Sequence, residues 1–160
     1  MSDEVKNLDA LINEIGFEIA QIIDENMINK ILGVLANDGV YAMWVYCLNK
    51  LTEKDFSSFL KQLSVLPVKI IDKENNNEIE LVKEDIEQYL NLLDEINEIK
   101  NDKTKNEELK QKRVEKQEYF IKFEQFFQNL SADIHQLLFF KDMVEKALIY
   151  ARYHAKAMGD

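Results

Sequence analysis

The sequence predicts an all-α fold, a helical bundle of about five to seven helices, on three observations. Residues that break helices are scarce, with four Gly and a single proline, Pro67, among the 160 residues. Apolar residues make up 46% of the chain, enough for a buried core. They recur at spacings of three and four along most of the chain, as in helices that bury one face. We therefore expect a single helical domain over residues 1–160.

Two amphipathic helices are predicted at the start of the chain. The first covers about residues 8–23, where acidic side chains separate apolar ones at Leu8, Leu11, Ile12, Ile15, Ile19, Ile22 and Ile23. The second runs from about Asn26 and directs Ile28, Ile31, Leu32 and Leu35 inward. The Asn-Asp-Gly sequence at 37–39 closes it, because these residue types tolerate a left-handed backbone.

Residues 40–51 are apolar nearly all round, which is typical of a helix at the centre of a core. Trp44 is expected to be part of that core rather than a platform on which nucleic-acid bases stack. Thr52, followed three residues later by Asp55, resembles a capping box and predicts the start of a further helix. Pro67 ends that run.

Residues 68–118 are predicted as an insertion on the helical core. Residues 68–82 form either a small hairpin or an irregular loop, because two apolar runs flank the polar sequence DKENNN. Helical periodicity returns over residues 86–99. After a polar break, residues 107–127 are predicted as one helix that is polar at first and aromatic later.

The final helix, residues 137–160, combines an apolar stripe with cations beside it, and Asn129 or Ser131 is expected to cap it. The candidate phosphate contacts are Lys141, Lys146, Arg152 and Lys156. All of them except Lys146 fall within about 60° of one another at roughly 100° per residue. Such a helix can pack through one face and hold an anion beside it. Cations near a helix C-terminus also stabilise the helix dipole, which is the alternative role.

The net charge of −10 is unevenly spread along the chain. Residues 1–100 hold 20 acids against nine bases, a net charge of −11, whereas residues 101–160 hold 10 acids against 11 bases, a net charge of +1. A protein devoted to nucleic-acid binding usually has a clear basic footprint, which this chain lacks as a whole. Any RNA binding is therefore expected to be weak and to involve the C-terminal third.

A second basic cluster lies in the polar part of the 107–127 helix and just before it. Its cations are Lys103, Lys105, Lys110, Lys112, Arg113 and Lys116, interrupted by Glu107, Glu108 and Glu115. Spacings such as that of Glu108 and Lys112 favour ion pairs along the helix surface, each worth tenths of a kcal/mol. Contact with phosphate is the other interpretation.

The sequence contains no recognised catalytic or metal-binding motif, and we expect no enzyme, no metal and no cofactor. Neither His135 nor His154 has a second ligand at a metal-binding spacing. Cys47 stands alone in an apolar run, which predicts a buried thiol with a raised pKa, unsuited to nucleophilic attack. The lone cysteine fits a reducing cytoplasm. We find no signal peptide and no apolar run long enough to span a membrane, so the prediction is a soluble cytoplasmic protein.

Two segments of the sequence resemble the small subunit of type III CRISPR effector complexes, the α-helical protein of the Cmr type. In that group an early helix leads through a short polar turn containing Gly into an apolar helix with aromatics, and ILGVLANDGVYAMWVYCLNKL at 31–51 is similar. The group also ends in an apolar helix with Arg and Lys near the terminus, as in ALIYARYHAKAMGD at 147–160. The chain departs from the group in its acidic charge and in the segment from 68 to about 118, which has no counterpart.

The resemblance implies a non-catalytic subunit of an antiviral ribonucleoprotein. Such subunits stack along a filament of backbone subunits, help to hold the guide–target RNA, and leave cleavage to other subunits. The positions that would contact RNA phosphate are Lys141, Lys146, Arg152 and Lys156, without sequence preference. An acidic face including Glu14, Glu18 and Asp24 would meet basic neighbouring subunits. The alternative is a helical adaptor or regulator that binds only proteins, through exposed parts of residues 119–127 and 137–150.

Overall fold

The computed structural model describes residues 2–72 and 74–159, with side chains from residue 7 onward, and confirms the all-α prediction. Seven α-helices and one short hairpin occur in these ranges. The helices are α1 (Ser2–Ile22), α2 (Glu25–Asp38), α3 (Val40–Lys50), α4 (Glu53–Leu63), α5 (Lys83–Ile99), α6 (Asn106–Ser131) and α7 (Ile134–Gly159). The hairpin consists of β1 (Ile70–Asp72) and β2 (Asn77–Ile79), and a 3-10 turn, η1 (Lys103–Lys105), precedes α6.

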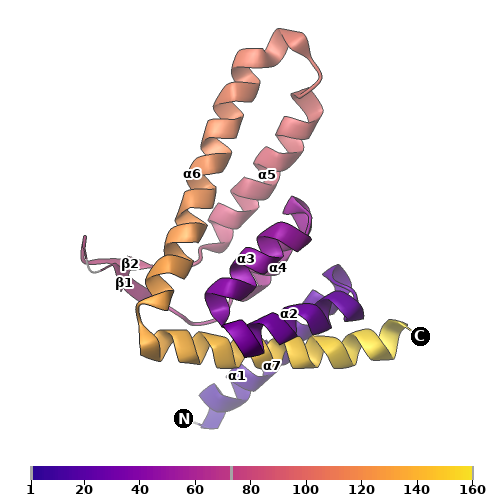
Figure 1. Cartoon of the computed structure of the whole chain (residues 1–160), viewed down its shortest axis with the longest axis vertical. Helices are drawn as coiled ribbons and strands as arrows, with labels where there is room; N and C mark the ends of the chain where they lie inside the picture. Colours follow the sequence, from indigo (N-terminus) through magenta and orange to yellow (C-terminus); the bar gives the residue numbers. More distant parts are fainter. Residues whose placement is uncertain (1, 73, 160) are drawn as a thin grey trace.

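The molecule has two regions, a body and a projecting arm (Figure 1). In the body, α7 crosses α1 and packs against α2, while α3 and α4 lie between these helices and the arm. The arm is the distal part of the antiparallel α5–α6 pair, and we define it as residues 94–118. The predicted insertion, 68–118, therefore contributes the hairpin, α5 and the distal half of α6.

The crossing of α1 and α7 depends on small residues. Gly16 of α1 lies directly on α7, where a Cβ atom would come within 2.7 Å of the Tyr150 Cβ and 2.8 Å of the Ala147 carbonyl oxygen. Ala147 and Ala151 are fully buried at the same place. Because Gly16, Ala147 and Ala151 have small side chains or none, the two helix backbones can approach closely and bury their apolar stripes against each other.

Aromatic rings fill the centre of the body, where α3 meets α6. The Trp44 ring stacks on Phe127 at 4.5 Å between centroids, and Phe126 and Phe140 meet Phe127 edge to face. Trp44 retains 3% of its exposure, so the prediction that it belongs to the core is confirmed. Such ring pairs add about 0.5–1.5 kcal/mol each beyond the area that they bury. This cluster joins α3, α6 and α7.

The arm has little apolar interior. Its buried residues, Ile96, Ile99 and Leu109, form a small cluster separate from the main core. Ion pairs supplement it: Lys112 Nζ lies 2.8 Å from Glu95 of α5, and the hydrogen bond between them raises the pKa of Lys112. The arm is thus a two-helix extension held together by a few contacts along its length.

Helix caps show where local sequence signals succeed and fail. Thr52 caps α4 as predicted, since its hydroxyl accepts a hydrogen bond from the Asp55 backbone N–H at 3.1 Å. The predicted cap of the last helix is wrong. Asn129 and Ser131 belong to α6, where their side chains bond to carbonyl oxygens one turn earlier. Asp133 caps α7 instead, accepting from the Gln136 N–H at 3.2 Å.

The segment 68–82, for which the sequence allowed a hairpin or a loop, forms the hairpin. Its strands pair antiparallel, with Ile70 opposite Ile79 and Asp72 opposite Asn77. Asn76 adopts φ = 56° at the turn, a left-handed conformation that Asn tolerates. Ile70 is buried, and β1 packs against α6, which anchors the hairpin to the body.

Candidate functional site

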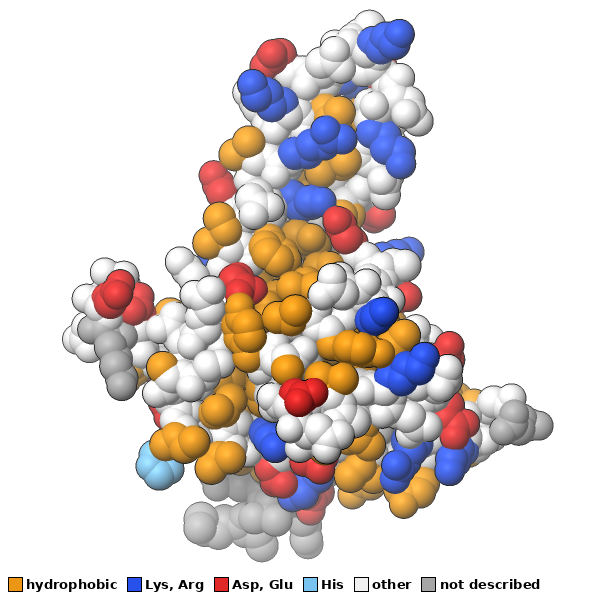
Figure 2. All heavy atoms as spheres, in the orientation of Figure 1, with side chains coloured by type: hydrophobic (Ala, Val, Ile, Leu, Met, Phe, Trp, Pro, Cys, Tyr) orange, Lys and Arg blue, Asp and Glu red, His pale blue; other side chains and the backbone are white. Residues whose placement is uncertain are grey.

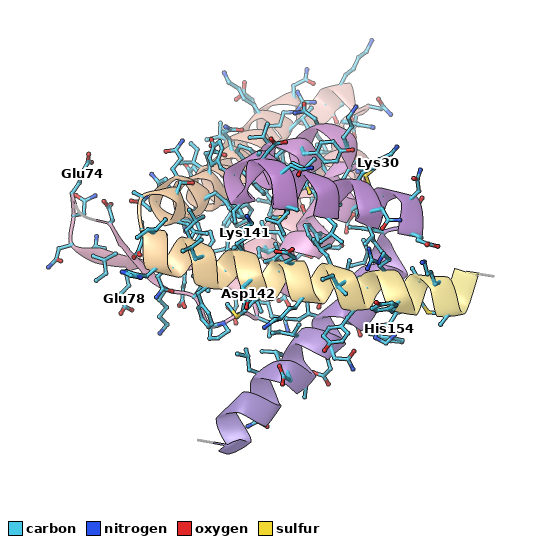
Figure 3. The ribbon with its side chains drawn as sticks, turned by 60° about the horizontal axis from the view of Figure 1, so that its bottom comes forward. Lys30, Glu74, Glu78, Lys141, Asp142 and His154 are labelled. Carbon is cyan, nitrogen blue, oxygen red and sulfur yellow. The ribbon has the colours of Figure 1, made fainter. Side chains whose placement is uncertain are left out.

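The predicted phosphate contacts of α7 divide between two sides of the helix. Figure 3 shows Lys141 on the side that faces α2 and α3, and Asp142 and His154 on the side toward α1. By helical position Arg152 and Lys156 share the side of Lys141. The structure places Lys146 elsewhere, where its Nζ pairs with Asp142 at 3.1 Å. Three of the four predicted residues are therefore aligned and the fourth is not.

The aligned cations are partly engaged by the protein itself. Lys156 lies 3.9 Å from Glu25 at the start of α2, an exposed pair of little strength. The Arg152 guanidinium lies over the Tyr153 ring at 5.5 Å, and its Nε is enclosed without a hydrogen-bond partner among the described residues. Lys141 is partly buried and forms no ion pair within the described ranges. The enclosed Arg152 Nε is out of reach of an external anion, but Arg152 and Lys141 form no ion pair among the described residues, so the remaining guanidinium N–H groups and the Lys141 ammonium could donate hydrogen bonds to one.

Lys146 behaves as a surface ion pair. The hydrogen bond with Asp142 raises the pKa of Lys146, and Asp9 of α1 adds to the effect. Both members of the pair are more than half exposed. Binding an anion there would require Asp142 to give up its partner, so Lys146 is the least suited of the four to hold phosphate.

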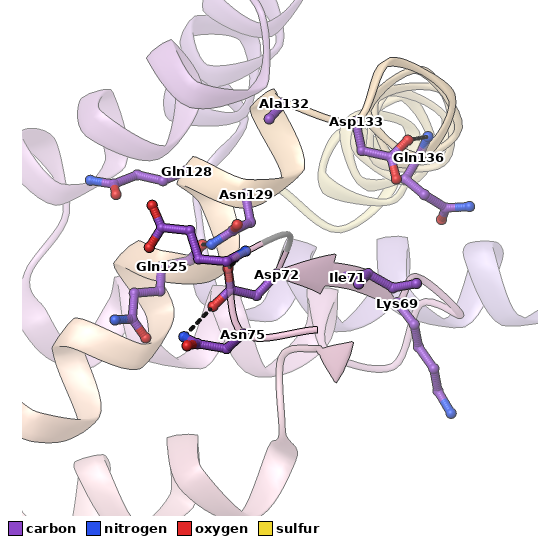
Figure 4. A pocket seen from close by; sticks show the side chains of 11 residues that line it. Lys69, Ile71, Asp72, Asn75, Gln125, Gln128, Asn129, Ala132, Asp133 and Gln136 are labelled. Atoms are coloured by element: carbon purple, nitrogen blue, oxygen red, sulfur yellow. Dashed lines mark hydrogen bonds between the residues drawn. The ribbon is translucent and has the colours of Figure 1, made fainter. Parts of the chain in front are cut away.

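A broad cleft lies between the hairpin and the corner where α6 meets α7 (Figure 4). It encloses about 840 Å³, and its carboxamide side chains are Asn75, Gln125, Gln128, Asn129 and Gln136. Asp72 and Asp133 also line it, and the Asn75 amide donates to Asp72 at 3.0 Å. Acids and neutral amides suit an uncharged polar group better than a phosphate. Sequence analysis missed this cleft, because two segments that are far apart in the sequence, 69–75 and 125–136, build it.

A carboxylate that bridges α3 and α6 forms a second polar cluster. Glu124 accepts hydrogen bonds from the Tyr41 hydroxyl, from Trp44 Nε1 at 2.6 Å and from Gln128 Nε2 at 3.3 Å. Burial raises the pKa of Glu124, but the three hydrogen bonds together outweigh burial and lower it. The hydrogen bond to Glu124 raises the pKa of the Tyr41 hydroxyl. All the partners are satisfied, so this cluster fastens α3 to α6.

The described residues offer little for covalent or metal chemistry. They contain no group of three or more His, Cys, Asp or Glu side chains that could hold a metal ion. His154 bonds to Asn13 at 3.1 Å and meets the Phe17 ring edge to face, a packing role. Burial raises the pKa of the Cys47 thiol to about 12, which leaves it protonated and unreactive at neutral pH.

The α6 cations of the second basic cluster, at 103–116, fall into two sets on different sides of the helix. Lys112 and Lys116 point toward the carboxylates that face them, Glu95 and Glu108 for Lys112 and Glu53 of α4 for Lys116. The predicted pairing of Glu108 with Lys112 is present at 4.0 Å. Lys110 and Arg113 lie on a different side of α6, along a shallow groove. The sequence did not distinguish these two sets, because Glu95 and Glu53, which face the first set, are on other helices.

Comparison with known proteins leaves the function to be argued from the residues. No protein-family model, no curated protein and no solved structure matches the chain. Within the described ranges, no helix has both the length and the apolar character that crossing a membrane requires. The arrangement of cations, acids and apolar surfaces on the helices therefore carries the functional interpretation.

Proposed function

We propose that this protein is a non-catalytic small subunit of a type III CRISPR RNA-guided effector complex in the cytoplasm. In this role it packs along the backbone subunits and helps to hold the guide–target RNA. The supporting observation is spatial. The two segments that resemble the group, 31–51 and 147–160, belong to α2, α3 and α7, and α2 packs against both of the others in the body. The segment without a counterpart supplies the hairpin and the arm.

The RNA contact in this proposal is the side of α7 that faces α2. Lys141, Arg152 and Lys156 would hold phosphate oxygens there as positioning contacts without base recognition. Exchange of the weak Lys156–Glu25 pair for a phosphate costs little, because that pair is solvent-exposed. Lys146 would contribute only long-range attraction, since Asp142 neutralises it. The net charge of −10 keeps RNA affinity low outside the complex.

Protein neighbours would supply most of the binding free energy. Glu14 and Glu18 are exposed on α1, and Asp24 is exposed just before α2, so a basic neighbouring subunit would meet a complementary surface. Phe17 lies among these acids at 44% exposure and gives the surface an apolar anchor. Repetition of such a contact from one copy to the next would build a filament.

Affinity purification of the tagged full-length chain from the cells that produce it tests this proposal. We expect a multi-subunit complex that carries short RNAs of uniform length. Recovery of one protein partner without RNA would contradict the proposal. Arg152→Ala combined with Lys156→Ala should lower the RNA recovered per complex and leave the protein composition unchanged. Lys30→Ala combined with Lys54→Ala makes the same change of charge at exposed body positions and serves as the control.

A protein-binding adaptor is the second candidate, and exposed apolar side chains favour it. Leu138 and Phe139 at the start of α7 are 56% and 39% exposed, and Ile121 of α6 is 46% exposed. These residues belong to 119–127 and 137–150, the segments through which the sequence predicts binding to partner proteins. Salt separates the two candidates, because phosphate contacts weaken steeply as salt rises whereas apolar contacts do not.

A further inference from the structure

The distal part of α6 presents a face with cations and no acids. Asn106, Lys110, Arg113 and Gln117 follow one another at intervals of three and four, so they fall within about 60° on the helix surface at roughly 100° per residue. The acids of the same part of α6 lie on other sides: Glu107, Glu108, Glu115 and Glu118. The helix thus separates its charges by face, although its sequence mixes them.

A shallow groove of about 430 Å³ runs along this face. The residues that line it are Asn106, Leu109, Lys110, Arg113, Val114 and Gln117, with no carboxylate among them. Lys110 and Arg113 are exposed, and neither forms an ion pair with any described residue. Lys112 and Lys116 on the neighbouring side are both paired, so among the cations that α6 contributes to the arm, the unpaired ones are those of the groove.

The arm as a whole is close to neutral: residues 94–118 hold eight acids against seven bases, a net charge of −1, whereas the rest of the chain has a net charge of −9. Lys100, Lys103 and Lys105 are exposed at the turn between α5 and α6, next to the groove residue Asn106. Figure 2 shows several Lys and Arg side chains over the upper half of the arm with fewer acidic ones among them, whereas both signs are mixed over the body. Because the rest of the chain is strongly acidic and the arm is nearly neutral, a polyanion is repelled less by the arm than by the body.

The chemistry of these residues defines the ligand. Lys and Arg only donate hydrogen bonds, so their ligand must supply negatively charged acceptors. The row from Asn106 to Gln117 is about 16 Å long at 1.5 Å per residue, which suits a linear polyanion better than a single small anion. Val114 beside the cations is exposed and provides apolar contact for sugar or base surfaces, which a strand of nucleic acid also carries.

We propose that the groove on the distal face of α6 binds the phosphodiester backbone of a single nucleic-acid strand. The choice of RNA as the natural strand rests on the proposed function, whereas the binding face itself does not. The site is separate from the cation side of α7, which lies in the body. Lys110 and Arg113 contact the phosphates, and Asn106 and Gln117 add hydrogen bonds at the two ends of the row.

The test is a titration of the full chain against a labelled single-stranded RNA of mixed sequence, about 30 nucleotides long, at several salt concentrations between about 50 and 200 mM. Lys110→Ala combined with Arg113→Ala should weaken binding several-fold at the lowest salt. It should also reduce the slope of log affinity against log salt by about 1.4, since each phosphate contact contributes about 0.7. The control variant with Lys30→Ala and Lys54→Ala should keep the slope of the unaltered chain.

Three results would overturn the proposal: no salt-dependent RNA binding by the unaltered chain, equal slopes for the groove and control variants, or displacement of RNA by polyglutamate at equal charge concentration. The last would identify the groove as a site for acidic protein. DNA of the same sequence distinguishes the source of the phosphate, and either preference supports a backbone contact. The groove variant should still co-purify the protein subunits, so failure here differs from failure of the proposed function.

Discussion

The body and the arm are built from the same kind of element but are stabilised in different ways. In the body, helices cross at Gly16 with their backbones nearly touching, and rings such as Trp44 and Phe127 stack within the core. In the arm, two helices run side by side over a cluster of three buried residues, supplemented by exposed ion pairs. Exposed ion pairs contribute at most about 1 kcal/mol each to the free energy of unfolding, whereas a buried aromatic ring contributes about 3–5 kcal/mol.

This difference suggests a division of labour. Dense packing fixes the body, which contains the segments on which the proposed function rests. The arm has little packing to lose, so most of its surface is available to a partner, and local opening should cost less free energy there than in the body. The following substitutions test the comparison, beginning with the largest expected effect.

Phe127→Ala should destabilise the whole protein by about 3–5 kcal/mol, because it leaves a cavity among Trp44, Phe126 and Phe140. Urea unfolding followed by circular dichroism measures this change in the free energy of unfolding. Ile121→Ala on the same helix is the control, since Ile121 is 46% exposed and should change stability by no more than about 0.5 kcal/mol. Equal effects at the two positions would show that the ring cluster is not the centre of the core.

Leu109→Ala should cost about 2 kcal/mol, and the loss should be confined to the arm. Leu109 belongs to the small cluster with Ile96 and Ile99, which is separate from the main core, so its removal should loosen the arm without reaching that core. Hydrogen exchange should accelerate over residues 94–118 and remain unchanged in α1 and α7. Uniform acceleration through the chain would mean that the arm and body unfold as one unit.

Gly16→Ala and Gly33→Ala should change stability in opposite directions. A Cβ at Gly16 meets α7 at 2.7 Å and should destabilise by about 1–2 kcal/mol, even after the gain in helix propensity. At Gly33 nothing lies within 4 Å of the added atom, so the substitution should stabilise by up to about 1 kcal/mol. Thermal unfolding of both variants measures the difference. A stabilising Gly16→Ala would refute the close crossing.

Local sequence patterns predicted the helices well and the contacts between them less well. The apolar run at 40–51 predicted a core helix, and the structure buries Trp44 there. The stacking of Trp44 on Phe127, 83 residues later, could not be predicted from periodicity. Periodicity shows which face of a helix is buried, but it does not show which other helix covers that face. The same limit applies to α7, where helical angles aligned Lys141, Arg152 and Lys156 without revealing Glu25 as a neighbour.

The misses have identifiable physical causes. Asn129 and Ser131 are good capping residues, but both belong to the last turn of α6, which ends at Ser131, and Asp133 caps α7 instead. The cleft beside the hairpin depends on the register of β1 and β2 and on the angle at the α6–α7 corner, neither of which the residue order determines. The unpaired cations Lys110 and Arg113 could be distinguished from Lys112 and Lys116 only after the structure showed which carboxylates face the latter two.

The division between body and arm is tested most directly by shortening the arm. Residues 94–116 would be replaced by a short Gly-Ser turn that joins α5 to α6, and thermal unfolding would verify that the body remains folded. The tagged variant would then be purified from the natural source beside the full chain, and protein and RNA would be quantified in each. Our account predicts the same protein subunits with both chains and less RNA, released at lower salt, with the shortened one. Loss of the subunits from a folded variant, or unchanged RNA, would contradict it.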